Sequence, residues 1–179
     1  QERYQSVGEL IEAVSVYLTR IEELERRFKL ADEASEKAHA LAERSEALNT
    51  ERRKHEAELI DLEWATPPSA PLSERAHLWT LRERYSLLSE EADVTFEEAE
   101  RAYQGALSFY REHKEASVRL AYLYSTALEE ALARRESREV RRLRAALAEH
   151  QKGEYEGLLG GEAKVQVRLT QSLPNAQVE

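Results

Sequence analysis

The chain contains no cysteine and no methionine among its 179 residues, and it has only six glycines and four prolines. Without cysteine, disulfide bonds, thiolate metal sites and cysteine nucleophiles are excluded. Three of the prolines lie within residues 67–71, so long stretches on both sides hold no residue that breaks a helix. Because the chain also begins with Gln1, we expect it to be a fragment of a longer protein.

Long runs of charges of one sign are also missing. The net charge of -9 arises from 26 basic and 35 acidic residues that are interleaved along the chain, as on solvated helix faces. The sequence contains no basic patch of the kind that binds nucleic acid and no run of about 20 apolar residues that could span a membrane. Its N-terminus lacks the apolar core of a signal peptide. We therefore expect a cytoplasmic segment that contacts neither nucleic acid nor membrane. A hydrophobic fraction of 41% and a charged fraction of 34% suit a thin core.

A long first helix is predicted from Ser6 to Glu63, with a length of about 85 Å. Ser6 and Glu9 have the spacing of a capping box, in which each side chain bonds the backbone amide of the other residue. Apolar and small side chains then recur at heptad spacing, which predicts a seam for a partner helix. The seam consists of Leu10, Val14, Tyr17, Ile21, Leu24, Phe28, Ala31 and Ala38.

The stretch from Thr66 to Pro71 ends this helix, because each proline lacks an amide donor and disfavours helix in the residue before it. Ser73 is predicted to cap a second helix, which has the strongest periodic pattern in the chain. Its seam consists of Leu78, Leu81, Tyr85, Leu88, Ala92, Phe96, Ala99, Tyr103, Ala106 and Tyr110. Folding back near residue 68 brings the alanine-rich stretches 31–42 and 95–106 together and leaves residues 7–23 as an overhang.

Two shorter helices are predicted at about 116–134 and about 137–150, and their short connections imply antiparallel neighbours. Beyond Gly153, apolar and polar residues alternate from Ala163 to Thr170, as in a half-buried strand. The predicted fold is mainly all-α. It comprises the overhang (1–23), a long antiparallel coiled-coil hairpin (24–113) with its tip at 65–72, a short bundle of base helices (114–152), and a Gly-rich turn with a small β-hairpin (153–179).

Two Glu-x-x-His pairs, Glu36/His39 and Glu74/His77, have the spacing of metal ligands in di-iron bundles. In the hairpin register above, the two histidines lie about 30 Å apart along the axis. One metal ion cannot bind both, since ligand distances are near 2 Å. We therefore expect no metal and no cofactor, and we interpret all histidines as surface residues, including His55, His113 and His150.

No phosphate-binding glycine loop, nucleophile elbow or kinase catalytic motif occurs in the sequence. The adjacent glutamates at 97–98 and at 129–130 have the chemistry of an acid and a base. Neighbouring residues of a helix point to different sides, however, so we interpret both pairs as parts of solvated faces. We therefore expect no catalytic residue in this chain and no enzyme activity of its own.

Exposed apolar positions are the candidate partner-binding residues. Trp64 and Trp79 flank the proline tip, and two interpretations are open for them. Either they pack on each other and close the hairpin, which we favour, or they anchor a partner together with Tyr85. The candidate partner-binding residues are Leu10, Val14, Tyr17 and Ile21 on the overhang, and Trp64 and Trp79 at the tip.

Two separate stretches resemble a known family. Residues 3–13, which begin Arg-Tyr-Gln-Ser, are similar to the end of the catalytic domain in bacterial eukaryotic-like Ser/Thr protein kinases, where an Arg-Tyr-x-Ser motif opens the last helix of the C-lobe. Residues 147–161, the strand pattern and residues 174–178 resemble the region after the kinase domain in planctomycete and myxobacterial kinases, as does the place of Trp79. Asn175 stands where that turn has Gly.

This resemblance implies that the parent protein is a Ser/Thr kinase and that the chain is a non-catalytic region starting in the last kinase helix. The implied partners are proteins: the parent kinase domain, a downstream module, or a second copy that forms a homodimer. The helices from about 95 to 150 also resemble degenerate TPR units, although they do not align in register with that repeat. The alternative is a free-standing coiled-coil adaptor unrelated to kinases.

Overall fold

The computed structural model describes residues 7–150, Tyr155 and Leu159. This part of the chain forms four helices, which confirms the predicted all-α class. The predicted β-hairpin and the capping residue Ser6 lie outside the described residues. The helices are α1 (Val7–Ala65), α2 (Leu72–Phe109), α3 (Lys114–Ala133) and α4 (Ser137–His150), and the bounds of α4 match the prediction.

Helix α1 runs through 59 residues without a break, a length of about 88 Å. Its only glycine, Gly8, lies in the first turn, and it contains no proline. Ion pairs between successive turns add to this local preference: Glu23 lies 2.9 Å from Arg26 and 2.8 Å from Arg27. Local sequence alone therefore favours a continuous rod.

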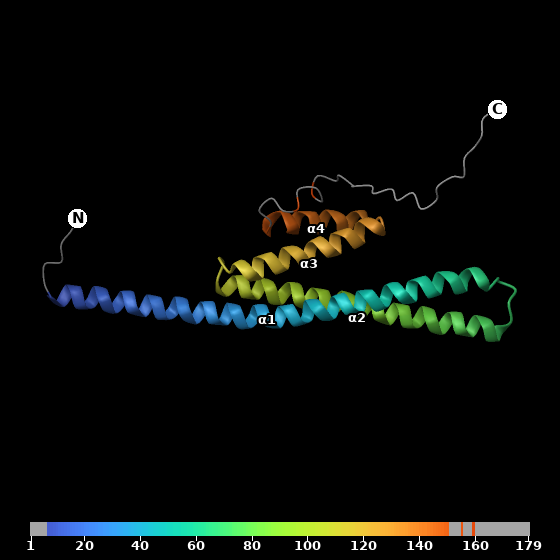
Figure 1. The fold of residues 1–179 in the computed structure, drawn as a ribbon, viewed down its shortest axis with the longest axis horizontal. Coiled ribbons are helices and arrows are strands. Elements are labelled where there is room, and N and C mark those ends of the chain that lie inside the picture. Colours follow the sequence, from blue (N-terminus) through green and yellow to red (C-terminus); the bar gives the residue numbers. More distant parts are fainter. Residues whose placement is uncertain (1–6, 151–154, 156–158, 160–179) are drawn as a thin grey trace, which may run out of the picture.

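Helices α1 and α2 lie side by side in opposite directions, joined by the proline-rich turn (Figure 1). Ion pairs join Arg44 to Glu91 at 2.6 Å and Glu51 to Arg84 at 3.4 Å, so residues later in α1 meet residues earlier in α2. Fully buried small side chains lie between the two helices and let their backbones approach closely. These residues are Ala31, Ala38, Ala99 and Ala106.

The start of α2 differs from the prediction. The helix begins at Leu72, and its N-cap position is Pro71, which makes no side-chain capping hydrogen bond. The backbone oxygen of Pro71 accepts the first helical hydrogen bond from Arg75 at 3.2 Å. Ser73 therefore lies inside the first turn, and the predicted cap was wrong. The physical reason is the fixed φ of proline, here -55°, which prepares the chain for a helix without a polar cap.

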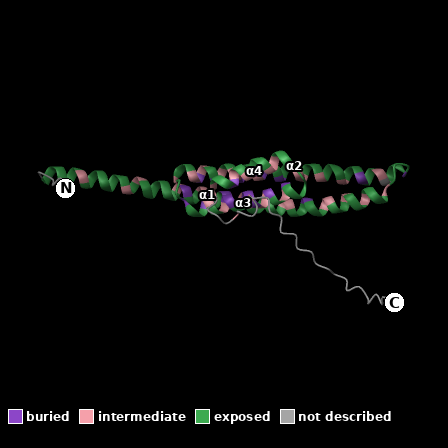
Figure 2. Ribbon diagram, turned by 90° about the horizontal axis from the view of Figure 1, so that it is seen from above, coloured by how far each residue is buried: buried purple, intermediate pink, exposed green. Residues whose placement is uncertain are grey.

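Helices α3 and α4 fold back along the hairpin and thicken the half of it that is farther from the proline tip (Figure 1). Most of the buried residues lie where these helices meet, whereas the N-terminal end of α1 is almost entirely exposed (Figure 2). The largest fully buried side chains of this core are Tyr103, Leu120, Tyr124, Leu128, Leu143 and Leu147.

His113 is not the surface residue that was predicted. Its ring is buried and caps α3, because Nδ1 accepts a hydrogen bond from the backbone N–H of Ala116 at 3.1 Å. The ring of Phe28 stacks on it at 5.4 Å, and Asp32 lies 3.4 Å from Nε2. Burial of His113 thus depends on α1, which is distant in sequence and lies against this corner only in the folded chain.

Candidate functional site

The overhang of α1 carries four of the predicted partner-binding residues. Leu10, Val14 and Tyr17 are exposed, Tyr17 by 63% of its surface, and Ile21 is half-buried. Val7 and Leu24, which continue the same spacing, are exposed as well. We call these six residues the N-terminal seam. This part of α1 extends beyond the other three helices in Figure 1, so no helix of the described chain covers it.

The N-terminal seam belongs to the same stripe of α1 that α2 covers farther along. Five α1 residues are buried, and they follow the seam at spacings of three, four and seven residues: Ala31, Ser35, Ala38, Ser45 and Arg52. The cover ends where the ring of Phe28 meets that of Tyr110, just past the end of α2, at 5.6 Å. The seam therefore continues the stripe that α2 buries, and contact with the other helices ends near residue 28.

The tip does not bring its two tryptophans together. Trp64 is 87% exposed, and Trp79 is also exposed, with the Arg75 guanidinium 6.0 Å from its ring centroid. A ring this exposed cannot be packed against another ring, so the favoured interpretation of a closed tryptophan pair was wrong. The reason is the orientation at the helix ends: the residue that faces inward at the tip is Ala70, which is buried.

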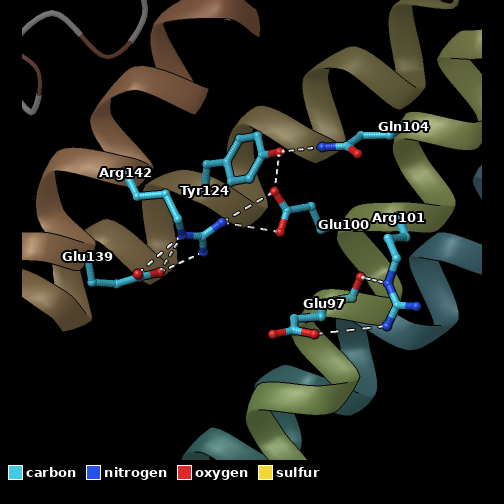
Figure 3. Close-up of polar contacts among 7 residues, drawn as sticks. All are labelled: Glu97, Glu100, Arg101, Gln104, Tyr124, Glu139 and Arg142. Atoms are coloured by element: carbon cyan, nitrogen blue, oxygen red, sulfur yellow. Dashed lines mark hydrogen bonds and ion pairs between the residues drawn. The ribbon is translucent and has the colours of Figure 1, made fainter.

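A charged cavity of about 710 Å³ lies between the four helices. Two of its lining residues, Glu100 and Gln104, bond the Tyr124 hydroxyl, which donates to Glu100 Oε1 at 2.8 Å and accepts from Gln104 Nε2 at 3.3 Å (Figure 3). The guanidinium of Arg142 joins Glu100 at 3.4 Å to Glu139 at 2.6 Å. The network therefore ties α2, α3 and α4 together, and its carboxylates are already engaged with partners of this chain.

Burial, followed by the hydrogen bond to Glu100, raises the pKa of Tyr124 to about 12. The neutral hydroxyl is favoured in the folded state, so stability is complete below the ordinary pKa of about 10 and falls as the pH rises from there towards 12. Tyr124→Phe should lower the free energy of unfolding at pH 7 by about 1.5–3 kcal/mol, since a hydrogen bond to a charged group is lost.

Urea unfolding at pH 7 and at pH 11 tests both effects. The wild type should lose stability between these pH values, and Tyr124→Phe should lose less, because it has no hydroxyl to ionise. Tyr122→Phe is the matched control, since Tyr122 is exposed on the same helix. Equal losses in all three proteins would contradict the assignment.

A buried ion pair also lines the charged cavity. The Arg52 side chain is only 3% exposed and donates to Glu130 at 2.9 Å, while Arg53 bonds the other carboxylate oxygen of Glu130. Arg134 lies 3.8 Å from the same carboxylate. The sequence predicted that Glu130 lies on a solvated face, and this prediction was wrong. Glu130 fixes the C-terminal half of α3 to α1.

A second, mainly apolar cavity of about 400 Å³ lies between α1, α2 and α3. Tyr103, Phe96, Leu123 and Tyr155 are among the residues that line it. Among the residues that the structure describes, no cluster of three or more His, Asp or Glu side chains is placed to hold a metal ion. Within the same residues, no helix is both long and apolar enough to cross a membrane.

Comparisons with protein-family models, with curated proteins and with solved structures found no match to this chain. The functional argument therefore depends on the chain's own geometry. Of the surfaces described above, the carboxylates Glu100 and Glu130 of the charged cavity are engaged in intramolecular bonds, whereas the N-terminal seam presents apolar side chains to solvent. The seam is the candidate functional site.

Sequence patterns pointed to the seam but not to the polar contacts around the core. Arg52 gave one usable signal, because it occupies a seam position of α1 where an apolar residue is expected. Its partner Glu130 follows another glutamate on a charged helix and carries no such signal. A partner for a buried charge becomes visible only when α3 is placed against α1.

Proposed function

We propose that this chain is a non-catalytic helical segment of a bacterial Ser/Thr protein kinase, with a regulatory or scaffolding role exercised through protein contacts or self-association. The observation that carries the proposal is the exposed N-terminal seam on a helix that continues without a break into the hairpin. An apolar helix face of this kind suits another protein surface. The resemblance of residues 3–13 to the end of a kinase lobe supplies the kinase part of the proposal.

In this role the rod separates the catalytic domain from downstream modules. Because α1 contains no proline and no break, the orientation of a domain attached at its start would be transmitted to the hairpin. The proposal includes an antiparallel coiled coil with degenerate TPR-like base helices and a small β-hairpin in residues 153–179. It also includes a cytoplasmic location and a second protein contact through Trp64 and Trp79.

The coding sequence upstream of Gln1 tests the kinase association. A catalytic domain with His-Arg-Asp and Asp-Phe-Gly motifs should end immediately before this chain. In that parent protein, removal of residues 25–179 should leave phosphoryl transfer to a generic peptide intact, since the segment supplies no reacting group. An upstream sequence without kinase motifs would refute the association and favour the free-standing coiled-coil adaptor.

A further inference from the structure

We infer that the N-terminal seam binds the same seam of a second copy of this chain, with the two α1 helices antiparallel. The inference deepens the proposed function and rests on it in one respect, namely that the overhang is a protein-binding surface. It names the partner and the register of the contact.

The shape of the exposed face suits a helix. At about 100° per residue, the seam together with Ile11 and Leu18 covers an arc of about 140° on α1 between residues 7 and 24. Every residue of this stretch that falls within the arc is apolar. The charged residues of the stretch, such as Glu12 and Arg20, lie outside it. Such a stripe is wide enough to hold one neighbouring helix.

The orientation follows from the place where α2 ends. A partner helix on the seam lies in line with α2, because α2 covers the continuation of the same stripe from Ala31 onward. A parallel copy of α1 would run from the seam into the space that α2 and Tyr110 already occupy beside Phe28. The α1 helix of an antiparallel copy would begin beside the end of α2. It would then continue in the same direction as α2, away from the occupied space.

The register follows from the seam's own symmetry. In an antiparallel pair, Val7 meets Leu24, Leu10 meets Ile21 and Val14 meets Tyr17 of the second copy. Each contact occurs twice, so all six residues of both seams are covered. Beside this core, Ile11 meets Leu18 of the second copy. The arrangement is an isologous contact with two-fold symmetry, which closes on itself as a dimer.

A shift of one heptad is the principal competing register. It would require Phe28 to meet Leu10 of the second copy, but Phe28 already contacts Tyr110 and His113 in its own chain. It would also place Arg20 opposite Arg20 of the second copy, which is repulsive. The end of α2 therefore selects the register that uses residues 7–24 alone.

The contact is short, which limits its strength. Eighteen residues span about 27 Å, or two and a half heptads. Interfaces at the small end of the size range form transient complexes. We therefore expect a dimer with a Kd on the order of micromolar, populated only at raised concentration.

Sedimentation of the 179-residue chain over a concentration series tests the pairing. The mass should rise from 20.6 kDa towards twice that value, about 41 kDa. Val14→Glu should weaken the dimer at least tenfold, since it places two carboxylates in the seam. Val16→Glu is the matched control, because Val16 is exposed on the side of α1 away from the seam, and it should dimerise like the wild type.

Disulfide trapping tests the orientation, and the absence of native cysteine keeps the readout clean. Leu10→Cys mixed with Ile21→Cys should give a cross-linked heterodimer, since a disulfide needs Cα atoms within about 7 Å. Each variant alone should stay uncross-linked, because in the antiparallel register its two copies lie about 16 Å apart along the axis. Self-cross-linking of either variant would indicate a parallel pair and overturn the register.

A wild type that remains monomeric at high concentration, or equal effects of Val14→Glu and Val16→Glu, would refute the pairing. These measurements use the chain alone, so they would leave the kinase association untouched. Conversely, an upstream sequence without kinase motifs would refute that association without affecting the dimer. If the parent protein is monomeric while the chain dimerises, the catalytic domain covers the seam, and the pairing does not operate in the parent.

Discussion

Replacement of Glu130 by Ala should lower the free energy of unfolding by about 3–5 kcal/mol, the cost of leaving a buried charge without its partner. The Glu130 carboxylate accepts hydrogen bonds from Arg52 and Arg53 and lies near Arg134. Arg53 and Arg134 are partly exposed and can turn to water. Arg52 cannot, since its side chain is 3% exposed, and its remaining acidic neighbour, Asp93, lies 3.9 Å away.

Three variants separate this effect from a general weakening of α3. Glu129→Ala removes the exposed neighbouring carboxylate and should change stability by less than about 0.5 kcal/mol. Glu130→Gln keeps a hydrogen-bond acceptor, so its loss of stability should lie between those of Glu129→Ala and Glu130→Ala. Arg52→Leu combined with Glu130→Leu removes both charges and should recover much of the loss. Urea unfolding monitored by circular dichroism measures all of them, and equal losses in Glu129→Ala and Glu130→Ala would contradict the buried pair.

The substitution Leu128→Ala should destabilise the protein by about 2–5 kcal/mol, because it leaves a cavity in a fully buried part of the core. Leu128 lies on α3, which contacts all three other helices. Loss of packing there should loosen the attachment of both α3 and α4 to the hairpin. Thermal unfolding should therefore show a lower midpoint, or a separate early transition of the base helices before the hairpin melts.

The matched control is Leu132→Ala, the same change one turn later on the same helix. Leu132 is 39% exposed, so little buried surface is lost and no closed cavity forms. Its expected cost is below about 1 kcal/mol. Similar losses for the two leucine variants would show that α3 does not pack in the way described.

Prediction from the sequence succeeded where local chemistry decides. The bounds of α4 followed from apolar spacing and short connections, and the all-α class followed from the same kind of pattern. Prediction failed where a residue's surroundings come from a distant part of the chain. The predicted cap at Ser73 failed for a local reason instead, because Pro71 is the N-cap and the helix starts two residues earlier.

The candidate site divides in the same way. Leu10, Val14, Tyr17 and Ile21 were predicted from their spacing, and three of them are exposed in the folded chain. Trp64 and Trp79 were expected to face each other, yet a pairing of side chains depends on the rotation of each helix at the tip, which spacing alone does not determine. His113 and Glu130 were interpreted as solvated residues, and both are held in contacts with α1.

By itself, the sequence determined that this chain is helical and that one stripe of its first helix needs partners, because a helix forms through bonds between residues four apart and its apolar stripe follows the helical period. Only the tertiary structure decided where that stripe is covered. The contact of Phe28 with Tyr110 and His113 closes the corner at which α2 ends. That corner leaves the N-terminal seam exposed and fills the space that a parallel copy of α1 would need, since packing depends on residues far apart in the chain.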